Sequence, residues 1–110
     1  MRFEKNPWAL KPETVRVSVD FEGLIPLFMA RRQDDLSAWE AALARADAEA
    51  LEAIGHRLKG TCATFGFQAL TEMGEALEAM ARNEAWDEAA ALLDAFREYL
   101  ASVSIHVVPD

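Results

Sequence analysis

A histidine and a lysine share one face of a predicted helix, and a glycine follows them directly. His56 and Lys59 lie three residues apart, and Gly60 comes next. Residues at this spacing are neighbours on the surface of an α-helix. An imidazole titrates nearer to neutral pH than any other side chain, so it can act as a nucleophile, an acid, a base or a metal ligand. The spacing therefore indicates a histidine-centred site with a cation beside it.

The hydrophobic pattern of this helix turns the histidine away from the core. The apolar residues recur at helical spacing and form one stripe: Leu51, Ile54, Leu58, Cys62 and Phe65. His56 and Lys59 fall on roughly the opposite face. Gly60 offers no side chain to obstruct an approaching partner, and the same reasoning extends to Gly55, although a packing requirement would also explain either glycine. These residues predict an imidazole presented to a macromolecular partner.

Composition and charge limit the classes of function. The formal net charge of -8 argues against binding to nucleic acid and to anionic membranes. The apolar run over 24–30 is far shorter than the roughly 20 residues that a membrane span needs, and no signal peptide is recognisable. A single cysteine excludes an intramolecular disulfide and fits a reducing compartment. We therefore expect a cytoplasmic protein.

Hydrophobic periodicity predicts four helices with short connections, over residues 21–45, 48–65, 68–82 and 85–102. Asp20 and Asp47 are the predicted N-caps of the first two helices, and Gly66 is predicted to end the second. Arg32 falls inside the apolar stripe of the first helix, which runs from Leu24 to Ala46; either its head reaches solvent along a packed stem, or the helix bends. The pattern predicts an all-α fold, an antiparallel up-down-up-down four-helix bundle.

Short alternating segments flank the helices. Val15, Val17 and Val19 alternate with polar residues near the start of the chain, and a similar alternation covers 103–107. These segments could pair antiparallel as a two-strand ribbon that joins the termini. We therefore expect a single domain over 1–110, with an N-terminal arm and short strand over 1–19, a helical bundle over 20–102 and a tail with a short strand over 103–110. Trp8 in the arm is a candidate to dock on the bundle.

Antiparallel pairing of the second and third helices supplies a candidate partner for the imidazole. If the chain turns near Phe67, residue 56 lies level with Glu78. A carboxylate that accepts a hydrogen bond from Nδ1–H would leave Nε2 unprotonated and outward as a nucleophile; Glu78 could instead be an ordinary surface residue. No metal site is expected, because Glu52 and His56 point outward whereas di-metal bundles direct their ligands inward.

The motif His56-x-Leu58-Lys59-Gly60, with its outward imidazole and the following Phe65-Gly66-Phe67 turn, resembles the histidine-containing phosphotransfer (HPt) domain. The resemblance extends from about Leu24 to Leu100. It implies that His56 accepts a phosphoryl group from a receiver-domain aspartate and relays it to another receiver in a multistep phosphorelay. Lys59 would attract the phosphoryl oxygens or the receiver's acidic pocket, unless it is simply a solvated lysine. In some members a glutamate or glutamine supports the histidine, which permits that role for Glu78.

The resemblance also implies the partners. These would be receiver domains of response regulators and a hybrid histidine kinase, met on the first two helices, with Leu24, Phe28 and Met29 as exposed apolar edges. The protein would act as a monomer without cofactor, and magnesium would belong to the partner receiver. The sequence has no P-loop and no kinase glycine loop, so we expect a phosphoryl carrier without autokinase activity. The alternative is an HPt-like interaction module that binds or sequesters a response regulator without phosphotransfer.

Overall fold

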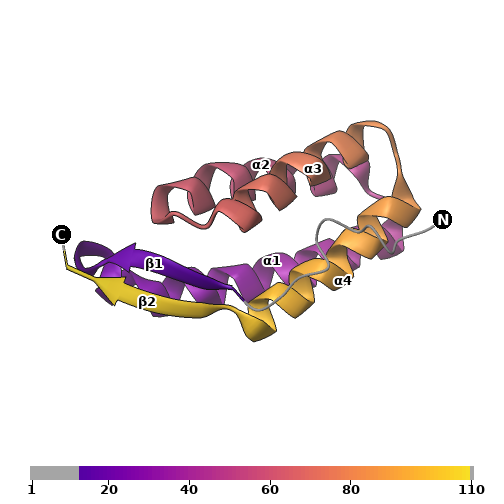
Figure 1. The fold of residues 1–110 in the computed structure, drawn as a ribbon. Coiled ribbons are helices and arrows are strands. Elements are labelled where there is room, and N and C mark those ends of the chain that lie inside the picture. The colour runs from indigo at the N-terminus through magenta and orange to yellow at the C-terminus, as the bar shows by residue number, and fades with distance from the viewer. Residues whose placement is uncertain (1–12, 110) are drawn as a thin grey trace.

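A computed structural model describes residues 13–109, which form a helical bundle and a short two-stranded ribbon (Figure 1). The helices are α1 (Ile25–Arg45), α2 (Ala48–Phe65), α3 (Gln68–Arg82) and α4 (Trp86–Ser102). Helices α2 and α3 run closer together than any other pair of helices, and α1 and α4 complete the bundle against them. The predicted all-α, antiparallel four-helix bundle is confirmed. The bounds of α2 and α3 agree with the sequence prediction, and α4 begins one residue later than predicted.

The start of the first helix differs from the prediction. The 3-10 helix η2 (Val19–Leu24) precedes α1, and its N-cap is Ser18, not Asp20 as predicted: the Ser18 hydroxyl oxygen accepts a hydrogen bond from the backbone N–H of Asp20. Pro26 lies in the first turn of α1, where its missing N–H is no loss. Because η2 takes up the residues expected to begin a continuous helix, Leu24 leaves the apolar stripe and is 49% exposed.

The terminal ribbon is parallel, not antiparallel as predicted. Strand β1 (Thr14–Ser18) pairs with β2 (Ser104–Val108), with Val15 opposite Ile105 and Val17 opposite Val107. The reason is η2, which reverses the chain between β1 and α1, whereas α4 continues directly into β2 (Figure 1). Both strands therefore run in the same direction. Val15 and Val17 face the core as expected, but Val19 belongs to η2 and is 44% exposed.

The turns on either side of α2 follow simple local chemistry. The side chain of Asp47 accepts a hydrogen bond from the backbone N–H of Ala50, which confirms it as the N-cap of α2. Gly66 ends the helix in the left-handed conformation at φ 83°, where glycine is favoured. Ala46 takes a similar conformation at φ 53° and ends α1, so it does not extend the apolar stripe as predicted.

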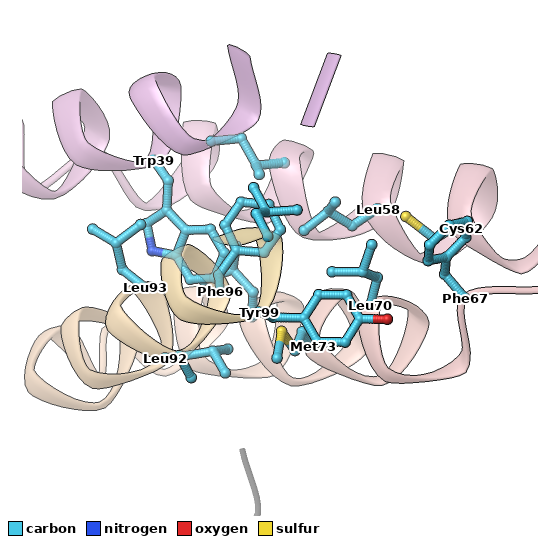
Figure 2. Packing of buried hydrophobic residues seen from close by; sticks show 14 of the residues in the cluster. Trp39, Leu58, Cys62, Phe67, Leu70, Met73, Leu92, Leu93, Phe96 and Tyr99 are labelled. Atoms are coloured by element: carbon cyan, nitrogen blue, oxygen red, sulfur yellow. The ribbon is translucent and has the colours of Figure 1, made fainter. Parts of the chain in front are cut away.

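The core lies between the α2–α3 pair and the α1–α4 pair. Trp39 is fully buried there and packs against Phe96 (Figure 2). Its indole N–H donates to the carbonyl oxygen of Ala89 at 3.2 Å. Cys62 is also fully buried, as the sequence predicted, and burial raises the pKa of its thiol to about 11. Within residues 13–109, no helix combines the length and the hydropathy needed to cross a membrane. Trp8 lies outside the described residues.

Candidate functional site

Helix α2 presents His56 to solvent by the amphipathic pattern that the sequence predicted. Leu51, Ile54 and Leu58 are buried on one face of the helix. The side chain of His56 points the other way and is 77% exposed. A small diffusible donor or a docked partner can therefore reach this imidazole without any rearrangement of the bundle.

Glu78 on α3 contacts both His56 and Lys59. Its Oε2 lies 3.1 Å from Nδ1 of His56, and its Oε1 lies 2.7 Å from Nζ of Lys59. The Glu78 side chain is only 6% exposed, whereas the lysine side chain is 40% exposed. The predicted contact between residues 56 and 78 is thus present. The structure also places the lysine on the same carboxylate, which the sequence had not indicated.

The protonation state of Glu78 determines the tautomer of the imidazole. The hydrogen bond from Lys59 lowers the pKa of Glu78 from its ordinary value, and that from His56 adds to this effect, although burial acts in the opposite direction. The carboxylate is therefore ionised at neutral pH and can only accept hydrogen bonds. Nδ1 of His56 must then carry the proton in this contact. In the neutral ring this leaves Nε2 unprotonated, with its lone pair directed away from Glu78.

An arginine and a second glutamate complete this side of the site. Nη2 of Arg82 lies 3.9 Å from Oε2 of Glu78, and its Nε donates to Oε2 of Glu52 at 2.8 Å. His56 and these three side chains line one shallow groove between α2 and α3, together with Glu49 and Ala53. The imidazole thus lies beside Lys59 on its own helix and Arg82 on the next.

A close crossing of α2 and α3 sets the distances in this site. A Cβ atom on Gly55 would lie 2.7 Å from the carbonyl oxygen of Gly74 and 2.8 Å from the backbone nitrogen of Glu78. Gly55 is buried, so the expected clearance for a partner is wrong at this position. The glycine is needed for packing instead: its missing side chain lets the backbone that carries Glu78 approach α2.

Gly60 has the opposite environment. Outside its own stretch of helix, nothing lies within 4 Å of the position where its Cβ atom would be, and the residue is exposed. A packing requirement therefore does not explain it. Since glycine costs about 1 kcal/mol relative to alanine in a helix interior, the open space agrees with the sequence-based prediction of clearance beside the imidazole.

Sequence reasoning missed a second charged cluster, which joins α1 to α2 next to His56. Asp35 is buried and accepts hydrogen bonds from Nε of Arg32 at 2.9 Å and from Nη2 of Arg57 at 2.7 Å. Arg32 is 3% exposed and packs over the ring of Phe28. Its head is therefore buried rather than turned to solvent, so the first of the two explanations predicted from the sequence is wrong. An aspartate three residues after an arginine in an apolar stripe was the signal available in the sequence.

The apolar edge beside this cluster also differs from the prediction. Leu24 and Leu27 are 49% and 54% exposed, whereas Phe28 is buried and Met29 is only partly accessible. The two leucines line a groove with Arg31, and Arg31 also lines the adjoining hollow that reaches Arg57. The exposed apolar surface is thus continuous with the arginine that follows His56 in the chain.

The comparison with known families agrees with this geometry. A sequence model of the Hpt domain matches residues 23–105, which include every helix described above except the first residues of η2. The chain belongs to the Hpt domain family. No curated protein and no solved structure matches it. Hpt domains are phosphocarrier modules of two-component phosphorelays and interact with the receiver domains of response regulators and hybrid kinases, so the protein takes part in phosphorelay phosphotransfer.

Proposed function

We propose that this Hpt domain carries a phosphoryl group on Nε2 of His56, which it accepts from the aspartyl phosphate of one receiver and delivers to the aspartate of another. The observation that supports the proposal best is the contact between the ionised Glu78 and Nδ1 of His56 at 3.1 Å. It leaves Nε2 as the free nucleophilic nitrogen of a largely exposed ring. In the accepting step, the bond from phosphorus to the aspartate oxygen breaks while the bond to Nε2 forms.

The partner receiver supplies the rest of the chemistry in this proposal. Phosphoryl transfer depends mainly on positioning and on neutralisation of the oxygens, which a receiver-bound magnesium ion provides. The protein itself acts as a monomeric carrier without autokinase activity, and a hybrid histidine kinase supplies the phosphoryl group through its receiver. Lys59 leaves Glu78 and interacts with the phosphoryl oxygens as they approach. Gly60 gives the receiver backbone room beside the ring.

The receiver docks on α1 and α2, over the exposed leucines and arginines described above. Leu24 and Leu27 supply apolar area, and Arg31 and Arg57 supply positive charge in a chain whose net charge is -8. A receiver presents acidic residues around its phosphorylated aspartate. The two arginines are complementary to these acidic residues, although the net charge of the chain is negative. Asp35 supports this surface because it fixes the Arg57 side chain through two hydrogen bonds.

The experiment is a transfer assay with phosphorylated receiver domains. Receivers labelled on aspartate are mixed with the wild type, with His56→Gln and with His106→Gln, a matched histidine control exposed on β2. Acid-labile label should appear on the wild type and on His106→Gln, and should be absent from His56→Gln. A protein that binds receivers but never acquires label would contradict the carrier and support the sequestering alternative.

A further inference from the structure

We propose that Glu78 retains the proton on Nδ1 of His56 while Nε2 carries the phosphoryl group, and that this proton keeps the group transferable. The inference rests on the proposed function and concerns the phosphorylated state. It gives Glu78 a task after the acceptance step, in addition to fixing the tautomer before it. Glu78 is thus a positioning residue that controls how easily the bond between phosphorus and nitrogen breaks.

The geometry keeps the carboxylate in contact with the ring. The Glu78 side chain is 6% exposed, and its Oε2 lies 3.1 Å from Nδ1. The backbone of Glu78 cannot shift away cheaply, because the crossing at Gly55 and Gly74 joins α3 to α2 at this level. Phosphorylation takes place at Nε2, on the far edge of the ring, so the contact at Nδ1 is left in place.

The proton on Nδ1 decides what leaves when the phosphoryl group departs. If Nδ1 is bare, breaking the bond from phosphorus to Nε2 returns the electron pair to a ring without a proton, and the leaving group is an imidazolide anion. If Nδ1 carries its proton, the same step releases a neutral imidazole with the proton still on Nδ1. Neutral imidazole is a much better leaving group than the imidazolide anion, because it is a far weaker base. With the proton retained throughout, neither transfer step needs a proton donor or acceptor.

The surrounding charges also favour a proton on Nδ1 once Nε2 carries the phosphoryl group. The charged groups that face the ring are Glu78 and Arg82 from α3, and Glu49, Glu52 and Lys59 from α2. Arg82 is already bound to Glu52, at 2.8 Å between Nε and Oε2. When Lys59 moves to the phosphoryl oxygens, the carboxylate of Glu78 loses its shortest ion pair. Its interaction with the cationic ring then strengthens, and this favours the protonated form.

A glutamine at the same position would not favour the protonated ring. The amide oxygen can accept from Nδ1–H, but it carries no full charge, and the amide N–H₂ group can instead donate to a bare Nδ1. Glu78→Gln therefore keeps the shape of the side chain and a hydrogen bond to the ring. It removes the negative charge that favours a proton on Nδ1. The exposed Glu75, one turn earlier on α3, offers the matched control Glu75→Gln with the same change in charge.

The test measures the loss of the phosphoryl group as a function of pH. The wild type, Glu78→Gln and Glu75→Gln are labelled with phosphoramidate, whose phosphorus–nitrogen bond breaks as Nε2 attacks and ammonia leaves. Hydrolysis is then followed across the neutral pH range. We expect the midpoint of the pH–rate profile to lie about one pH unit higher in the wild type and in Glu75→Gln than in Glu78→Gln. On the alkaline side of both midpoints, release from Glu78→Gln should be roughly tenfold slower.

Coincident profiles for the wild type and Glu78→Gln would overturn the inference, as would attachment of the phosphoryl group at Nδ1. If Glu78→Gln does not fold, the midpoint of the wild-type pH–rate profile is compared with that of free Nε2-phosphohistidine. A wild-type midpoint that is no higher than that of the free amino acid would also overturn the inference. A wild type that takes label from neither phosphoramidate nor a receiver, or that takes it equally after His56→Gln, contradicts the proposed function itself. The two failures are therefore distinguishable.

Discussion

Gly55 and Gly74 meet where α2 crosses α3, and each occupies the space that a side chain on the other would need. A Cβ atom on Gly74 would lie 2.7 Å from the carbonyl oxygen of Gly55 and 2.7 Å from the backbone nitrogen of Lys59. A Cβ atom on Gly55 would lie 2.8 Å from the backbone nitrogen of Glu78. The two glycines therefore bring together the backbones that carry the lysine and the glutamate of the site.

Gly74→Ala should force α2 and α3 apart. Overpacking of a close helix crossing costs about 1 to 3 kcal/mol, because backbone atoms cannot rotate out of the way as a side chain can. We expect the free energy of unfolding to fall by that amount, and the hydrogen bond between Glu78 and Nδ1 of His56 to weaken. Chemical denaturation measures the first effect, and ¹⁵N chemical shifts of the imidazole measure the second.

A variant with a cavity elsewhere in the bundle tests whether lower stability by itself changes the imidazole shifts. Leu92→Ala on α4 removes a fully buried side chain and should cost about 2 to 5 kcal/mol. It should leave the imidazole shifts of the folded protein as in the wild type. If Gly74→Ala leaves those shifts unchanged as well, the crossing does not position Glu78.

Gly60→Ala should change helix stability and receiver binding in opposite directions, because the added methyl group meets nothing within 4 Å outside its own stretch of helix. We expect the free energy of unfolding to rise by about 0.5 to 1 kcal/mol, as alanine favours the helix. If the glycine provides clearance for a receiver, labelling by a phosphorylated receiver should fall roughly tenfold more than labelling by phosphoramidate. Equal changes with the two donors would count against clearance.

Local periodicity was sufficient to predict much of the fold and part of the site. Leu51, Ile54 and Leu58 at helical spacing determine which way His56 points, and Asp47 and Gly66 fix the ends of α2 through their own side-chain and backbone chemistry. With both ends of α2 known, an antiparallel return through the turn at Phe67 brings residue 78 level with residue 56. The distance of 3.1 Å between the two side chains agrees with that deduction.

The features that the sequence did not reveal depend on tertiary contacts. The direction of β1 depends on the reversal through η2, and no periodic signal distinguishes that 3-10 turn from the start of α1. In the sequence, Arg32 only interrupts an apolar stripe. The structure explains its position, because Arg32 contacts Asp35 and the ring of Phe28. Gly55 resembles Gly60 in sequence context, and only the approach of Gly74 shows that it serves packing.

Leu27→Asp should weaken receiver binding with little effect on the fold, because the leucine is 54% exposed. An added negative charge on the proposed docking surface repels an acidic receiver and removes apolar contact area. We expect the dissociation constant to rise roughly tenfold, in the range of a substantial interface residue. Calorimetric titration with a receiver measures it. Ala90→Asp, at an exposed position of α4, adds the same charge away from this surface and should bind as the wild type does.

Acid should destabilise the wild type more than Glu78→Gln. The pKa of Glu78 in the folded protein is lowered, first by the hydrogen bond from Lys59 and then by that from His56, against an ordinary value of 4.5. A carboxyl group whose folded-state pKa is depressed contributes stability that is fully present above the unfolded value and is lost as pH falls through the folded one. The unfolding free energy of the wild type should therefore fall, relative to that of Glu78→Gln, as the pH drops from about 4.5 through the folded-state pKa of Glu78. Denaturation curves collected at several pH values measure this difference. A difference that stays constant as the pH falls below about 4.5 would mean that the contacts of Glu78 with Lys59 and His56 do not stabilise the folded protein.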